Sequence, residues 1–178
     1  MHRLTSKLVA AVLVACLAVA APAAARDSGS RRVSAQNALE RSLLGEINAY
    51  RAQHGLRALR LNRRLAAAAG AHSTAMIGAG FFAHESRDGT PFWQRVARWY
   101  AKRGYRSWGV GENLLWASPD VSAGGALKMW VASPPHRRNL LNPRWREVGL
   151  GALHASAAPG TFDGRAVTVL TADFGTRR

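Results

Sequence analysis

The sequence predicts one α+β domain in which helices come first and an antiparallel pair of strands comes last. Apolar side chains recur at helical spacing over much of residues 36–132, and they alternate with a period of two over residues 148–153 and 167–170. The chain has 178 residues and is 48% hydrophobic, which suffices for one packed core and is too apolar for a disordered chain. The sequence contains no internal repeat, and no domain boundary is found after residue 35.

Four helices are expected, and residue types that start or stop helices bound each of them. They cover about residues 34–54, 62–78, 90–104 and 118–132. Asn62 is suited to cap the second helix, and Thr90 with Pro91 supplies a cap and a proline at the first helical position of the third. Two prolines at positions 134 and 135 are expected to stop the fourth helix, and to leave His136 in a loop.

Extended structure is expected in three places. Residues 110–116 are short and mostly apolar, which favours a first strand. The two segments of period two then form an antiparallel pair, because the loop between them contains Pro159-Gly160 and Asp163-Gly164. Residues 56–61 and 81–86 show no period and are predicted to be connections.

The N-terminus has the layout of a secretory signal peptide, predicted over residues 1–25. Arg3 and Lys7 precede an apolar run from Leu8 to Ala21, and small residues follow up to Ala25, where cleavage is expected. The run has about 14 residues, fewer than the ~20 that span a bilayer. Residues 26–35 are predicted to be a polar, basic linker, and residues 36–178 the folded domain.

The only cysteine, Cys16, lies inside the apolar run. A single cysteine excludes a disulfide framework, and its position in the leader excludes a cysteine nucleophile. Residues 13–16 also resemble a bacterial lipobox, in which Cys16 becomes a lipidated first residue that anchors the protein to a membrane. The apolar run continues to residue 21, which favours a discarded leader over a lipoprotein.

The chain is strongly basic, with 25 Lys and Arg residues against 10 Asp and Glu and a net charge of +15. Removal of Arg3 and Lys7 with the leader lowers this to +13. Such a balance indicates an anionic partner, although an arginine-rich composition alone gives the same count. Nucleic acid is not the expected partner, because export is predicted and no nucleic-acid-binding motif is present.

Candidate functional side chains are scattered, and no metalloprotease helix, nucleophile elbow or phosphate loop is present. His72 shares a helical face with apolar residues and is interpreted as a core histidine. His84 and His136 lie among turn residues, where functional groups are frequent. Glu112 stands between Gly111 and an asparagine, where the fold is expected to hold it, and Glu147 precedes the strand pair.

A series of motifs in order gives the chain a family resemblance. The motifs are Asn48-Ala49-Tyr50-Arg51, Ala71-His72-Ser73, Phe82-Ala83-His84, Gly111-Glu112-Asn113, the block from Trp130 to Pro143, Glu147-Val148-Gly149-Leu150-Gly151 and Asp173-Phe174-Gly175. In this order and spacing the chain resembles a bacterial member of the CAP superfamily, which includes cysteine-rich secretory proteins, antigen five and plant pathogenesis-related proteins. The resemblance covers about residues 38–175.

This resemblance implies a three-layer α-β-α sandwich around a central antiparallel sheet, with a cleft where two histidines and acidic residues meet. By motif, His84 and His136 match the two histidines, and Glu112 matches the glutamate of the GEN segment. The second glutamate of the eukaryotic pattern is replaced by Ser133, so the acidic set is incomplete. The disulfides and cysteine-rich extension of the eukaryotic members are missing too.

Two imidazoles and a carboxylate suit zinc or another divalent cation, so His84 and His136, with Glu112, are candidate ligands. A hydrogen-bonded His–Glu pair without metal explains the same residues. Two functions remain open: an exported module that binds a lipid, glycan or anionic envelope ligand, and a metal-dependent hydrolase of peptide or envelope substrates. A periplasmic or extracellular monomer is expected.

Neighbouring residues can add to such a cleft. Arg137 and Arg138 follow His136 and either bring positive charge to its mouth or form a solvated turn. Trp130 is expected in the core, whereas Trp108 and Trp145 are expected nearer the surface, where tryptophan beside arginine can line a lipid or glycan groove. Trp93 is likewise expected near the surface.

Overall fold

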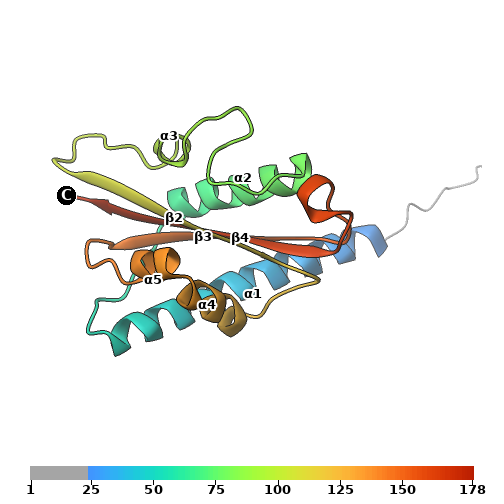
Figure 1. The fold of residues 1–178 in the computed structure, drawn as a ribbon, viewed down its shortest axis with the longest axis horizontal. Helices are drawn as coiled ribbons and strands as arrows, with labels where there is room; N and C mark the ends of the chain where they lie inside the picture. The colour runs from blue at the N-terminus through green and yellow to red at the C-terminus, as the bar shows by residue number, and fades with distance from the viewer. Residues whose placement is uncertain (1–23) are drawn as a thin grey trace, which may run out of the picture.

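The computed structural model describes the backbone of residues 24–178 and the side chains from residue 38 onward. The predicted leader up to residue 23 and the alternative at Cys16 therefore lie outside the described residues. Within the described part, the chain forms three layers, with a sheet between two layers of helices (Figure 1). The predicted α+β class and the α-β-α sandwich are both confirmed.

The central sheet has four strands in the order β1-β3-β4-β2. They are β1 (Arg60–Leu61), β2 (Trp108–Ala117), β3 (Glu147–Ala155) and β4 (Val167–Arg177). The pairs β3–β4 and β2–β4 are antiparallel, as predicted, whereas the short β1, which the sequence did not predict, runs parallel to β3. The order leaves β2 at an edge of the sheet.

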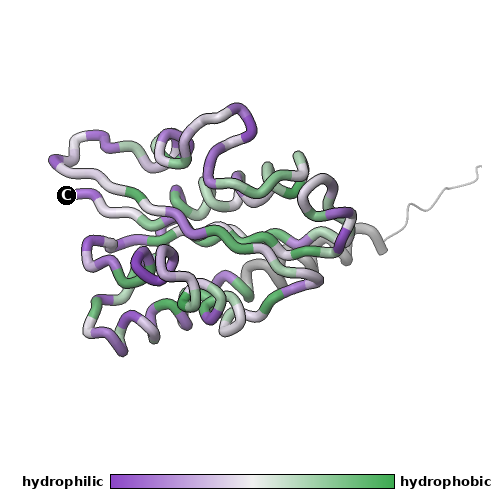
Figure 2. Tube along the Cα trace, in the orientation of Figure 1, coloured by the Kyte–Doolittle hydropathy of each residue, from purple (hydrophilic) through white to green (hydrophobic). Residues whose placement is uncertain are grey.

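Helices cover both faces of this sheet (Figure 1). One layer contains α2 (Arg63–Ala79) and the short α3 (Phe92–Ala97), and the other contains α1 (Ala24–Gln53), α4 (Ala123–Ala132) and α5 (Pro134–Leu140). Figure 2 shows that the central strands are mostly apolar and that the loops at the ends of the sheet are mostly hydrophilic. In residues 24–178, no helix combines the length and the apolarity that a membrane crossing requires.

The structure differs from the prediction at residues 26–35, which form the first turns of α1 rather than an irregular linker. The lack of an apolar period in this segment gave no reason to expect a helix. Extending an existing helix costs little, because each added residue gains one hydrogen bond without a new nucleation step. The predicted end of this helix is confirmed, since Gly55 follows with a φ of 67°.

The second helix has both of its predicted ends. The side chain of Asn62 accepts hydrogen bonds from the backbone N–H groups of Arg64 and Leu65, and Gly80 ends the helix in the left-handed conformation. Two glycines at alternate positions of β3, Gly149 and Gly151, let this helix lie close to the sheet. A Cβ atom on Gly149 would stand 2.0 Å from the backbone nitrogen of Ala66.

The third helix is shorter than predicted, and the fourth is followed by a helix that the sequence did not predict. Helix α3 ends at Ala97, and Pro91 is its cap residue rather than its first helical residue. Helix α4 begins at Ala123, where the Ser122 side chain caps it, and not at residue 118. The prolines at 134 and 135 stop α4 but also start α5, because proline fits the first helical turn. His136 therefore lies on a helix and not in a loop.

Candidate ligand-binding cleft

A cleft of about 450 Å³ lies against the edge strand β2. Successive residues of a strand face opposite layers, so Glu112 points toward α3 while Gly111 and Asn113 face α5. The loop between α2 and α3 contributes His84, and α5 contributes His136. The structure thus brings together, around one cleft, the three residues singled out from the sequence.

The carboxylate of Glu112 is held from two sides. Its Oε1 accepts a hydrogen bond from Nδ1 of His84 at 2.8 Å, and its Oε2 forms an ion pair with Arg95 of α3. Arg95 also donates from Nη1 to the backbone oxygen of His84 at 2.8 Å. The Glu112 side chain is 0% exposed, so Glu112 lines the cleft through its backbone while its carboxylate orients His84 from below.

This arrangement determines which nitrogen of His84 can meet a ligand. Because Nδ1 donates to Glu112, Nε2 is left as the acceptor of the neutral ring, and it has no hydrogen-bond partner among the described residues. The side chain is 45% exposed. His84 therefore presents an oriented imidazole to the cleft.

A second buried carboxyl group lies beside Glu112. Asp173 of β4 is the register partner of Glu112 and is 0% exposed. Neither of its carboxyl oxygens has a hydrogen-bond partner among the described residues. Burial, and then the neighbouring Glu112 carboxylate, raise the pKa of Asp173 well above its ordinary value, so the fold favours the protonated form of Asp173.

Asparagines attach α5 to the other face of β2. Asn113 donates from Nδ2 to the backbone oxygen of His136 at 3.1 Å. Asn139 lies on α5 and donates from Nδ2 to Oδ1 of Asn113 at 2.9 Å. A Cβ atom on Gly111 would stand 2.6 Å from Oδ1 of Asn139. Burial, and then nearby His84, lower the pKa of His136, so its imidazole is neutral near pH 7.

Several predicted candidates lie outside the cleft. His72 is 1% exposed and donates from Nε2 to the backbone oxygen of Ala83 at 2.9 Å, which confirms its interpretation as a core histidine. Glu147 accepts hydrogen bonds from Asn62 and Tyr100 and fastens α2 to β3. Arg137 and Arg138 are exposed on α5 and do not line the cleft.

Sequence reasoning missed Arg95 and Asp173. Asp173 lies in a motif that contributed to the resemblance, but nothing in that motif indicated where its side chain points. No feature of the sequence points to Arg95, because only the packing of α3 over the sheet brings its side chain to Glu112.

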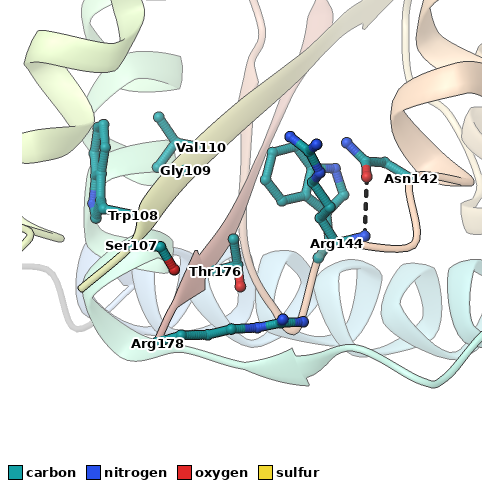
Figure 3. Close-up of a pocket in the computed structure, with 9 residues that line it drawn as sticks. Ser107, Trp108, Gly109, Val110, Asn142, Arg144, Thr176 and Arg178 are labelled. Carbon is teal, nitrogen blue, oxygen red and sulfur yellow. Dashed lines mark hydrogen bonds between the residues drawn. The ribbon is translucent and has the colours of Figure 1, made fainter. Parts of the chain in front are cut away.

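Two further hollows accompany β2. One, of about 270 Å³, continues along the same edge past Leu114 and Trp116 and shares His136 with the cleft. The other, of about 430 Å³, lies where β2 begins and β4 ends (Figure 3). Figure 3 shows Arg144 and Arg178 at this hollow, with the backbone nitrogen of Arg144 bonded to Oδ1 of Asn142 at 3.0 Å.

The tryptophans divide differently from the prediction. Trp130 is 1% exposed, as expected, and donates to the backbone oxygen of Leu114. Trp145 was expected nearer the surface but is 7% exposed, because it stacks on Phe174 and donates to Asn139. Trp93 is 47% exposed, as predicted, but does not line any of these hollows.

The comparison with known proteins identifies the family. The model of the cysteine-rich secretory protein family, CAP, matches residues 44–172, which is most of the chain. The chain belongs to the CAP family. This CAP domain is 28% identical over 130 residues to the uncharacterized protein YkwD of Bacillus subtilis, a match that covers 70% of this chain and 46% of YkwD. The chain thus spans about half the length of that relative.

Solved structures agree. An extracellular protein of Bacillus anthracis that contains an SCP domain superposes with a TM-score of 0.63 and 25% identity, over 82% of this chain and 42% of that one. An outer surface protein of Borrelia burgdorferi superposes with a TM-score of 0.59 and 20% identity, over 78% and 92% of the two chains. The latter likeness concerns the fold alone.

The cleft of this CAP domain does not hold a preformed set of three metal ligands. Among the described residues, no three His, Cys, Asp or Glu side chains are grouped as a metal site. Both oxygens of Glu112 are engaged by His84 and Arg95, which leaves the imidazoles of His84 and His136 and the exposed carboxylate of Glu85 as the cleft groups able to bind a cation. Two imidazoles and a carboxylate that no described residue holds in place fit a weak site rather than a closed one. Zinc binding stays a prediction.

Proposed function

We propose that this protein is an exported binding module whose cleft, between His84 and His136, holds a lipid or another component of the cell envelope. One observation carries the proposal: the carboxylate of Glu112, which holds His84 from the side of α3, is 0% exposed, and both of its oxygens are paired. A carboxylate in that position orients an imidazole but does not reach a substrate as a general base, which requires hydrogen-bond reach. Glu85 also lines the cleft, but it is exposed, and no described residue holds its carboxylate in place. These two features support binding rather than catalysis as the role of the cleft.

Charge and compartment support the same proposal. The predicted leader and the description of two structural neighbours as extracellular or outer-surface proteins favour export. A net charge near +13 after loss of that leader attracts anionic headgroups and polymers. The apolar hollow next to the cleft, lined by Trp116 and Met129, gives room for an acyl chain.

Co-sedimentation tests the proposal. The purified protein is mixed with phosphatidylglycerol vesicles, with phosphatidylcholine vesicles and with isolated envelope fragments, at low and at high salt. We expect binding to the anionic vesicles or to the fragments that weakens with salt, because exposed charges are screened. His84→Ala and His136→Ala should weaken it several-fold, while the control His54→Ala, an exposed histidine at the end of α1, should not.

Binding that both cleft variants leave unchanged would contradict the proposal, because surface arginines alone would then account for it. The absence of binding to all three preparations would contradict it too.

The second candidate function, a metal-dependent hydrolase, is favoured by one feature: two imidazoles line the same cleft. His84 and His136 would hold the ion, and a bound divalent ion lowers the pKa of its water. Isothermal titration with zinc at pH 7.5 tests this function, with His84→Ala and His136→Ala as variants. Zinc binding and peptide or envelope hydrolysis that both variants abolish would favour it, and zinc binding that neither affects would dismiss it.

A further inference from the structure

We propose that the open edge of β2 binds an extended peptide, which adds to the sheet as a further strand. The inference rests on the proposed function in one respect, since the peptide occupies the same cleft. It assigns to that cleft a ligand class, the peptide backbone. It also extends the ligand beyond His84 and His136 along the edge strand.

The register of the β2–β4 pair shows which backbone groups face outward. Ser107 and Arg178 exchange both backbone hydrogen bonds, at 2.9 and 3.1 Å, so they form a hydrogen-bonded pair. In an antiparallel ladder such pairs alternate along the strand. Every second residue of β2, beginning with Trp108, therefore directs its N–H and C=O away from β4: Trp108, Val110, Glu112, Leu114 and Trp116.

An independent contact agrees with this assignment. The indole nitrogen of Trp130, from α4, donates to the backbone oxygen of Leu114 at 3.0 Å, and α4 lies outside the ladder. From Val110 to Trp116, the other outward backbone groups have no hydrogen-bond partner among the described residues. Backbone groups that a fold leaves unpaired in a recess must bond to water or to a ligand.

The backbone of Glu112 is accessible from the cleft. The residue is 7% exposed, whereas its side chain is 0% exposed, so all of its exposed surface belongs to the backbone. The cleft thus has the outward backbone of Glu112 in its floor. Two polar side chains, His84 and His136, line the cleft on either side of this floor.

The two hollows lie next to each other along the edge, because His136 lines both and because they are lined by consecutive residues of β2, up to Asn113 in the cleft and from Leu114 in the second hollow. Together they are called the groove. The section near Glu112 is lined by polar side chains such as His84 and Asn139 together with Phe92 and Pro135, and the section near Trp116 is mostly apolar, with Met129 46% exposed beside it. From Glu112 to Trp116 the strand advances about 13 Å, which corresponds to a segment of roughly five residues. The groove therefore suits a short peptide with an apolar side chain at one end.

The pattern of unpaired groups favours a peptide over other occupants. Donors and acceptors that recur every second residue match a second strand, and an acyl chain has neither. A second copy of this chain would bring its own β2 flanked by the same helices, and two recessed edges do not approach each other closely.

Alternate N-methylation of a bound peptide provides the test. An array of random capped heptapeptides is screened with the purified protein, and the best binder is made in two further forms. One form is N-methylated at the odd amides and the other at the even amides. Because only one set of amides faces β2, we expect one form to lose at least tenfold in affinity and the other to stay within about twofold.

Two further measurements locate the peptide. Amide hydrogen exchange should slow at Glu112 and Leu114 when peptide is added, and stay unchanged at Gly111 and Asn113, which already bond to β4. Met129→Asp should weaken binding about tenfold at the apolar end. The matched control Leu61→Asp alters a residue that is 56% exposed on the opposite edge of the sheet, and it should have no effect.

The proposal is overturned if no peptide binds, if both methylated forms bind equally well, or if the amides of Glu112 and Leu114 are protected by a rise in protein concentration alone. The last result would assign the edge to a second copy. Cleft-dependent binding to vesicles or envelope fragments would then still stand, so failure of the edge proposal is distinguishable from failure of the proposed function.

Discussion

Glu112 and Asp173 lie directly opposite each other on β2 and β4, and both carboxyl side chains are buried on the same face of the sheet. Arg95 forms an ion pair with Glu112, and Asp173 has no hydrogen-bond partner among the described residues. Two ionised carboxylates in this position would repel each other. This repulsion, together with burial, raises the pKa of Asp173 and favours its protonated form beside Glu112.

Asp173→Asn should change how stability depends on pH. The unfolded chain ionises Asp173 near pH 4, whereas the folded chain retains the proton because the folded pKa is raised. The wild-type protein thus loses stability as pH rises above about 4, relative to the Asn variant, by at most about 1.4 kcal/mol per pH unit. Urea unfolding of both proteins at pH 4, 5.5 and 7 measures the difference between their free energies of unfolding. Parallel stability profiles would show that Asp173 ionises in the fold.

His136 should titrate below its ordinary range. Burial lowers its pKa, and the charge of nearby His84 lowers it further. We expect the NMR titration midpoint of the His136 ring to lie below about 6.5. His84→Ala should raise this midpoint by removing the neighbouring charge, and His54→Ala should leave it unchanged. A midpoint that does not respond to His84→Ala would mean that the two rings are farther apart than the cleft places them.

Glu112→Gln should be strongly destabilising. It leaves the guanidinium of Arg95 buried without its charge partner, which costs about 3–5 kcal/mol in comparable cases. The double variant with Arg95→Met should recover part of this loss, because it removes the unpaired charge. Chemical denaturation measures the free energy of unfolding of all three proteins.

The exposed ion pair of Arg165 and Asp163 provides the control for this experiment. Asp163→Asn should cost less than about 1 kcal/mol, since solvent screens such pairs. Asparagine also tolerates the left-handed backbone conformation at this position. Equal losses in Glu112→Gln and Asp163→Asn would contradict the buried pairing.

Gly149→Ala should prevent correct packing of α2 on the sheet. Its Cβ atom would meet the helix backbone at 2.0 Å, and backbone atoms give way far less readily than a flexible side chain. We expect a loss of about 4 kcal/mol or more, or failure to fold. Gly124→Ala in α4 meets no atom within 4 Å and should stabilise by about 0.5–1 kcal/mol. Thermal unfolding compares the two, and a mild effect at Gly149 would contradict the close helix approach.

Prediction from sequence succeeded where the cause is local. The Asn62 cap and the Gly80 terminus of α2 are chemical features that act within a few residues, and the period of two in β3 and β4 follows from alternation along a strand. The prolines at 134 and 135 show the limit of such reasoning. Proline can end one helix and begin the next, and here the two prolines do both. The start of α5 depends on its packing against β2, which the local sequence does not reveal.

The sequence alone was enough to predict the α+β class, the family, and His84, Glu112 and His136 as the residues to examine. Tertiary structure decided the role of Glu112, which faces Arg95 and Asp173 rather than the cleft, and left the backbone of β2 open beside His136. The physical reason is that caps and periodicity arise from neighbours in sequence. Side chains on separate elements meet only when strand register and layer packing place them together.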